Sequence, residues 1–128
     1  MNRLALIGLV LLALGCKDDV ASSASVTLRV VLTSPNSGQD GSAVVMLSGP
    51  ATPRSVVTVA GLQLWGAPVQ SSASTIALTG TLTNGTILTF ETDERYANQF
   101  SATLREVANI DATVGLRELT GYALAVMQ

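Results

Sequence analysis

The 128-residue chain contains no histidine and only one cysteine. Without histidine there is no Ser-His-Asp or Cys-His relay and no imidazole ligand for a metal. One cysteine allows no intramolecular disulfide, no thiolate zinc site and no redox pair. Lys17 is the only lysine, which disfavours a Ser-Lys dyad or a Schiff base inside a folded domain. We therefore expect no catalytic residue, no metal site and no cofactor, and we expect that the protein is not an enzyme.

Charged side chains are also scarce: they make up 12% of the chain and leave a formal net charge of -2. A nucleic-acid-binding surface needs clustered basic side chains, and the arginines here are scattered, so we expect no nucleic-acid partner. No Asp, Glu, Lys or Arg occurs from Ser55 to Phe90. Interface cores are depleted in charge, which makes this stretch a candidate docking face. A solvated Thr- and Ser-rich surface without a partner gives the same pattern.

A hydrophobic run stands at the N-terminus, where Arg3 precedes Leu4–Leu14. A basic residue followed by about 7–15 apolar residues is the anatomy of a secretory signal. The run is shorter than the roughly 20 residues that a transmembrane helix needs. Ala13-Leu14-Gly15-Cys16 follows directly, and this tetrapeptide resembles the lipobox of bacterial lipoproteins.

This resemblance implies that residues 1–15 are a cleaved signal-peptide helix and that Cys16 receives fatty acyl chains such as palmitate. Lys17 after the lipidated cysteine resembles lipoproteins sorted to the outer membrane, on its periplasmic or surface face. Residues 16–24 are small and polar, so we expect a tether of at most about 30 Å. The implied location is the bacterial cell envelope, with the membrane bound through the lipid. A plain secretory signal with an incidental thiol is the alternative.

From Ser25 onward the hydrophobic pattern has a period of two, which is typical of half-buried strands. Glycine- and proline-rich turns separate the runs. We expect strands over residues 26–33, 42–48, 55–60, 62–65, 75–82, 86–92, 100–107 and 119–127. We also expect a single helical turn within residues 93–99, capped by Asp93. Eight or nine short strands at this spacing predict an all-β fold, an antiparallel β-sandwich over residues 25–128.

The connection at Asn84-Gly85 predicts a hairpin between two of these strands. A two-residue turn would place the apolar side chains of the two strands on opposite faces. A three-residue loop with Gly85 at positive φ instead places Leu78 opposite Phe90, with both side chains on one buried face. The pattern favours this second register.

Four segments carry a second resemblance: Gly41-Ser42-Ala43, Ser48-Gly49-Pro50, Leu62-Gln63-Leu64-Trp65 and Gly85-Thr86-Ile87-Leu88-Thr89-Phe90. They are similar to the early and late strands of cohesin-like modules. The resemblance implies a nine-stranded jelly-roll sandwich, a fold that cohesins use to bind dockerins and that some carbohydrate-binding modules share. It carries over no contact residue.

The candidate ligand or partner face consists of Gln63, Trp65, Thr79 and Thr81, which the strand alternation predicts to point outward. Our leading hypothesis is a non-catalytic interaction or structural module at the membrane surface, with a protein partner on this face. The alternative is an envelope carbohydrate-binding module, which needs a row of exposed aromatic side chains near Trp65.

Two polar clusters have simpler interpretations. We interpret the acidic cluster of residues 91–94 as a charged strand end rather than a carboxylate pair for glycoside hydrolysis. We interpret the Asn- and Asp-containing segments around Asp40 and Asp111 as turns rather than calcium loops. We expect Tyr122, which follows Gly121, in the core or at a corner of the sandwich.

Overall fold

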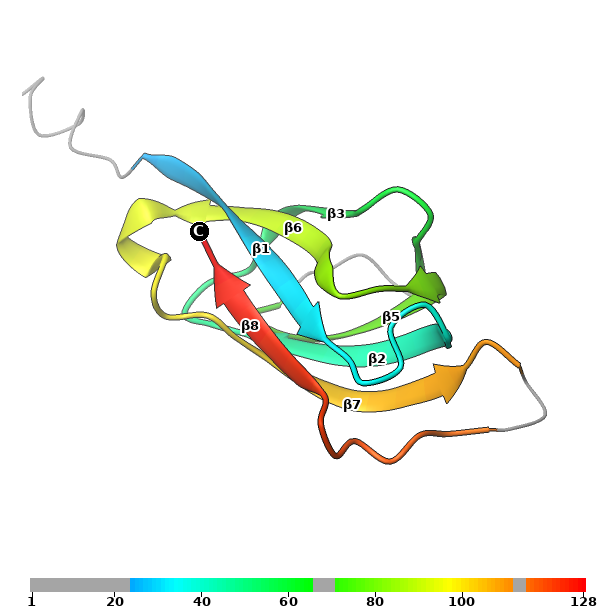
Figure 1. Ribbon diagram of the computed structural model, residues 1–128. Coiled ribbons are helices and arrows are strands. Elements are labelled where there is room, and N and C mark those ends of the chain that lie inside the picture. Colours follow the sequence, from blue (N-terminus) through cyan, green and yellow to red (C-terminus); the bar gives the residue numbers. More distant parts are fainter. Residues whose placement is uncertain (1–23, 66–70, 112–114) are drawn as a thin grey trace, which may run out of the picture.

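The computed structural model describes residues 24–65, 71–111 and 115–128. These residues form eight strands and one short 3-10 helix, η1 (Figure 1). The elements are β1 (Ser25–Thr33), β2 (Asp40–Ser48), β3 (Arg54–Thr58), β4 (Gln63–Trp65), β5 (Ala73–Leu82), β6 (Gly85–Asp93), η1 (Glu94–Tyr96), β7 (Ser101–Asn109) and β8 (Ala123–Met127). The prediction of an all-β fold is confirmed. The predicted signal-peptide helix, Cys16 and most of the tether lie outside the described residues.

Two four-stranded antiparallel sheets form the sandwich, which confirms the predicted architecture. One sheet, here called the β1 sheet, has the order β3-β6-β1-β8, and the other, the β2 sheet, has the order β4-β5-β2-β7. Strands β1 and β8, β2 and β7, β3 and β6, and β4 and β5 are neighbours. The first four strands thus pair in reverse order with the last four, as the two arms of one long hairpin do. Folding such a hairpin into two sheets gives the arrangement found in jelly rolls. No helix in the described part of the chain is long and apolar enough to cross a membrane.

The core lies between the two sheets and follows from the period of two. In β1, Leu28, Val30 and Leu32 are buried, whereas the residues between them point outward. Burying each such side chain stabilises the fold by about 1.5–3 kcal/mol. The other buried apolar residues are Ala43, Val45, Leu47, Leu62, Ile76, Leu78, Leu82, Ile87, Leu88, Phe90, Phe100 and Val107.

The predicted hairpin at Asn84-Gly85 is wrong. Strands β5 and β6 belong to different sheets, so Leu78 pairs with Ala43 of β2 and Phe90 pairs with Leu28 of β1. Both side chains are fully buried, and Gly85 has a positive φ of 116°. The prediction failed because alternation shows which side chains face the core. It does not show whether two such strands lie side by side in one sheet or across the core.

The helical turn after β6 is confirmed as η1, but Asp93 does not cap it through its side chain. The Asp93 carboxylate instead accepts hydrogen bonds from Arg54 Nη1 at 3.2 Å and from Arg95 Nη2 at 3.4 Å. Figure 1 shows the start of β1, η1 and the C-terminus at one end of the sandwich. We call this the η1 end, and the opposite end, where β1 finishes, the Asp40 end.

Candidate functional site

The four predicted site residues lie on two neighbouring strands of the β2 sheet. Gln63 of β4 pairs with Thr79 of β5, and Trp65 pairs with Ala77. The indole N–H of Trp65 donates a hydrogen bond to the Thr79 hydroxyl. In β5 the side chains of Ile76, Leu78 and Leu82 are buried, whereas Thr79 is half-buried and Thr81 is exposed, so the two threonines point away from the core. The structure thus places all four on the outer face of the β2 sheet.

This outer face continues across β2 and β7 with little charge. The outward residues of β2 are Ser42, Val44, Met46 and Ser48, which alternate with buried Ala43, Val45 and Leu47. Among the described residues of its four strands, exposed charged side chains occur only on β7, at Arg105 and Glu106. Arg105 Nη2 lies 3.2 Å from the Met46 sulfur. The face therefore consists mainly of hydroxyl and methyl groups, with one indole at its β4 margin.

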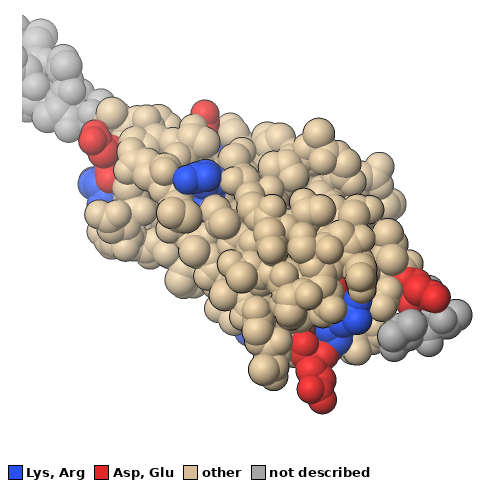
Figure 2. Space-filling model, viewed as in Figure 1, with Lys and Arg blue, Asp and Glu red and all other residues tan. Residues whose placement is uncertain are grey.

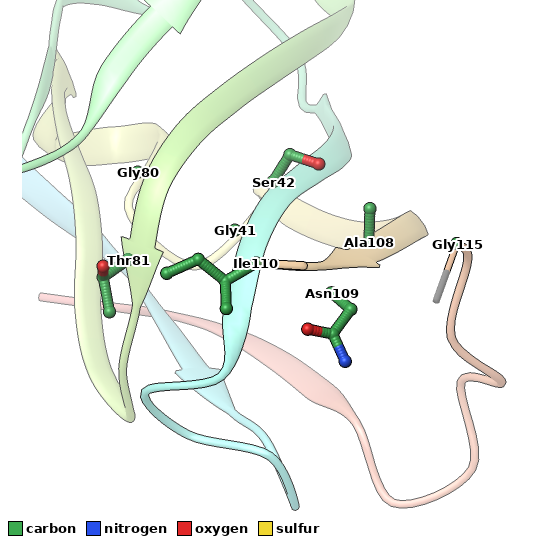
Figure 3. A pocket seen from close by; sticks show the side chains of 8 residues that line it. All are labelled: Gly41, Ser42, Gly80, Thr81, Ala108, Asn109, Ile110 and Gly115. Atoms are coloured by element: carbon green, nitrogen blue, oxygen red, sulfur yellow. The ribbon is translucent and has the colours of Figure 1, made fainter. Parts of the chain in front are cut away.

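Two shallow hollows lie where this face approaches the Asp40 end. The first has a volume of about 380 Å³ (Figure 3) and is lined by Gly41, Ser42, Gly80, Thr81, Ala108, Asn109, Ile110 and Gly115. The second has a volume of about 360 Å³ and is lined by Gly61, Leu62, Gln63, Thr79 and Gly80. None of these described lining residues is charged, so the hollows suit neutral groups.

Glycines are among the lining residues of both hollows and allow other backbone segments to lie close. Gly80 has a φ of 125°, and a Cβ at this position would overlap the Gly61 carbonyl oxygen. A Cβ at Gly41 would lie 2.7 Å from Ile110 Cα. Ile110 therefore rests directly on β2, and its side chain extends toward Thr81 (Figure 3). Side chains at these two glycines would displace the segments that shape the hollows.

Only one aromatic side chain contributes to this face. The chain has five aromatic residues, all of them described. Phe90 and Phe100 belong to the core, with ring centroids 5.0 Å apart. Tyr96 lies in η1 beneath the Arg95 guanidinium, and Tyr122 hydrogen-bonds at the Asp40 end. Trp65, 55% exposed, therefore stands alone, without the row of aromatic side chains that a sugar-stacking platform needs.

A buried polar network at the Asp40 end is the feature that the sequence analysis missed. Asp40 is fully buried, and its Oδ1 accepts a hydrogen bond from Arg117 Nε at 3.1 Å. Its Oδ2 accepts one from Ser34 Oγ at 2.7 Å. The Tyr122 hydroxyl lies 3.0 Å from both carboxylate oxygens. Protein donors thus engage both carboxylate oxygens, and Asp40 is not among the residues that line the two hollows.

The network ties together three separate connections of the chain. Asn36 Nδ2 donates to the Tyr122 hydroxyl at 3.0 Å, and the Ser34 N–H donates to Asn84 Oδ1 at 2.7 Å. The segment after β1, the β5–β6 connection and the segment before β8 are therefore joined through side chains. Within the described ranges, no three His, Cys, Asp or Glu residues are grouped as metal ligands.

The opposite side of the sandwich has a different charge distribution. Figure 2 shows this side in the orientation of Figure 1, and charged side chains gather at its two ends. Arg29, in the middle of β1, is also exposed. The β1 sheet thus carries a basic side chain at its centre, whereas the outer face of the β2 sheet carries its charges only at the β7 margin.

Comparison of the chain with protein-family models, with curated protein sequences and with solved structures gives no match. The resemblance to cohesin-like modules and to lipoprotein signals is therefore supported only by the sequence segments named above. The fold itself rests on the two sheets described above.

Proposed function

We propose that this chain is a lipid-anchored, non-catalytic interaction module of the bacterial cell envelope, with the outer face of the β2 sheet as its docking surface. The observation that carries this proposal is the nearly neutral face across four strands, with Trp65 exposed at its margin. Interface cores combine low charge with exposed aromatic and methionine side chains. The partner is accordingly a protein surface that is itself neutral and rich in apolar and hydroxyl groups.

The anchor in this proposal is Cys16 within the lipobox-like segment. Two or more acyl chains hold a protein stably at a bilayer. The described chain starts at the η1 end (Figure 1), and the docking face runs along the side of the sandwich. Attachment through the tether therefore leaves this face accessible.

A single lysine on the face tests the docking surface. We expect Gln63→Lys and Thr81→Lys to remove one specific partner in cross-linking pull-downs from envelope extracts, because an unpaired charge buried in an interface core costs several kcal/mol. The same substitution on a solvated strand changes stability by less than about 0.5 kcal/mol, so thermal melting stays unchanged. Thr27→Lys on the outer face of the β1 sheet, opposite Glu91, is the matched control.

The outcomes separate three interpretations. An identical set of captured proteins for wild type and all variants contradicts the docking surface. Binding to a glycan array that disappears in Trp65→Ala assigns the face to carbohydrate recognition instead. For the anchor, Cys16→Ser should lose metabolic labelling with a fatty acid, and label retained in that variant contradicts lipidation.

A further inference from the structure

The two sheets have four edge strands, and an unprotected edge offers its free backbone N–H and C=O groups to another strand. Strand β3 is protected by Arg54, by the positive φ of Ser55 and by an irregular register with β6. Strand β4 has only three residues. Charge, irregularity and short length are the usual devices that keep a sheet edge from pairing with other chains.

Strand β7 is also protected. It carries Arg105 and Glu106 and has an irregular register with β2. Its last residues are covered by the following segment, because the Arg117 N–H donates to the Val107 carbonyl at 2.7 Å and the Asn109 N–H donates to the Gly115 carbonyl at 3.2 Å.

Strand β8 has none of these devices. Its sequence, Ala123-Leu124-Ala125-Val126-Met127, contains no charge, proline or glycine. Its register with β1 is regular over five residue pairs, and among the described strands it has no partner on its other side. The outward residues Ala123, Ala125 and Met127 are exposed.

The core is also less completely covered along this side. Leu124 and Val126 point inward but are only half-buried, whereas Val30 and Leu32, their partners on β1, are at most 2% exposed. Leu104 of β7, which packs against the same core, is half-buried as well. A strand added beside β8 would extend the sheet and cover these side chains.

We infer that a second copy of this chain occupies the β8 edge, so that two β8 strands pair antiparallel around a two-fold axis at Ala125. This register places Ala125 opposite its own copy, Ala123 opposite Met127, and Leu124 opposite Val126. Inward residues then meet inward residues and outward residues meet outward residues. The strand is therefore complementary to itself in side-chain direction. It carries no charged residue, so no like charges meet when two copies pair.

Interface size and symmetry define the kind of association. A pair of five-residue strands falls below the roughly 1,200 Å² of standard interfaces, so the dimer is weak and needs concentrated copies. The lipid anchor of the proposed function supplies that concentration, and in this respect the inference rests on it. The two-fold axis is normal to the sheets and puts both β2 sheets on the same side. When the strands of the dimer lie parallel to the bilayer surface, both tethers can reach that bilayer. Both docking faces then point away from the membrane.

Disulfide trapping in membranes tests the axis with the full chain. Opposed residues on antiparallel strands have Cα atoms about 4.5–5.5 Å apart, within the range for a disulfide. Under a mild oxidant we expect Ala125→Cys to form a covalent dimer. Val57→Cys, outward and exposed on β3 at the other edge of the same sheet, and the wild type, which reports on Cys16, should give background only. No dimer at position 125, or equal yields at 57 and 125, overturns the inference.

Charge complementation provides a second test that does not depend on cysteine. The full chain is placed in phosphatidylcholine vesicles, and energy transfer between labelled copies is measured. Ala125→Lys and Ala125→Glu should each weaken association by up to about fivefold, because like charges directly opposite on paired strands repel. Mixing the two variants should restore the wild-type signal, and Val57→Lys should leave it unchanged. Loss without recovery in the mixture contradicts pairing at this residue.

The two proposals fail separately. Ala125 lies on the β1 sheet, so Ala125→Lys should retain the partner that Gln63→Lys loses. Self-association lost in Ala125→Lys with partner capture intact shows that the two surfaces act independently, and trapping that requires Cys16 shows that anchoring supplies the concentration. A position-125 cross-link found only to a different protein overturns self-pairing.

Discussion

Asp40 and Asp93 lie at opposite ends of the sandwich, and each accepts hydrogen bonds from arginine. The Asp40 side chain is 0% exposed and its partner Arg117 is 18% exposed. Asp93 is 25% exposed, and its partners Arg54 and Arg95 are 48% and 64% exposed. Removal of the carboxylate at the Asp40 end leaves buried donors without an acceptor. At the η1 end, water can replace the carboxylate.

The difference also lies in what each aspartate connects. Asp40 joins Ser34, Arg117 and Tyr122, which come from two distant parts of the sequence. Asp93 accepts hydrogen bonds from Arg54, at the start of β3, and from Arg95, which is only two positions away from Asp93 in the sequence. A buried network that joins distant segments stabilises the tertiary structure, whereas an exposed ion pair contributes little to the free energy of unfolding.

The largest effect is expected for Asp40→Ala. Breaking a buried ion pair from one side typically costs about 3–5 kcal/mol, a large part of the roughly 5–15 kcal/mol that stabilises a domain. Urea denaturation followed by circular dichroism measures the loss. Asp40→Asn separates charge from hydrogen bonding, because it retains an acceptor for Tyr122.

The partner variant makes this prediction specific. Adding Arg117→Met to Asp40→Ala removes the unpaired cation, so the double variant should be more stable than the sum of the two single losses predicts. A strictly additive result would mean that the pair does not act as a unit.

A smaller effect is expected for Tyr122→Phe. The variant removes the hydroxyl that donates to Asp40 and accepts from Asn36 Nδ2. Hydrogen bonds to charged groups contribute about 1.5–3 kcal/mol, and the free energy of unfolding should fall by that amount. Tyr96→Phe at the η1 end is the matched control and should stay within about 0.5 kcal/mol of wild type. Equal losses in the two variants would contradict the distinction between the ends.

Local patterns predicted most of the fold. The period of two located the strands and their buried faces, because side chains of a strand alternate between core and solvent. It also predicted that Gln63, Thr79 and Thr81 point outward. The predicted pairing of β5 with β6 was wrong. An alternating strand can have its apolar partner beside it in the same sheet or in the opposite sheet across the core, and the pattern is the same in both cases.

The Asp40 network could not be predicted in the same way. Asn36 and Tyr122 are 86 positions apart, and nothing in the local pattern of either residue identifies the other. One signal was present: Asp40 is the only charged residue between Arg29 and Arg54. An isolated carboxylate beside two apolar strands is a candidate for burial, and buried charges require partners. Finding Arg117 and Tyr122 as those partners needed the arrangement of the sheets.

The smallest effect is expected for Asp93→Ala, and its salt dependence gives the sharpest contrast with Asp40. Exposed ion pairs contribute up to about 1 kcal/mol, so the loss of unfolding free energy should stay below that value. At 1 M salt the Debye length falls to about 3 Å, and wild type and Asp93→Ala should then become nearly equal in stability. The deficit of Asp40→Ala should persist at the same salt concentration, because ions do not reach a buried carboxylate. Urea titrations of the three proteins at low and high salt measure both differences. If salt removed the Asp40→Ala deficit as well, that network would belong to the surface electrostatics and the two ends of the sandwich would not differ in kind.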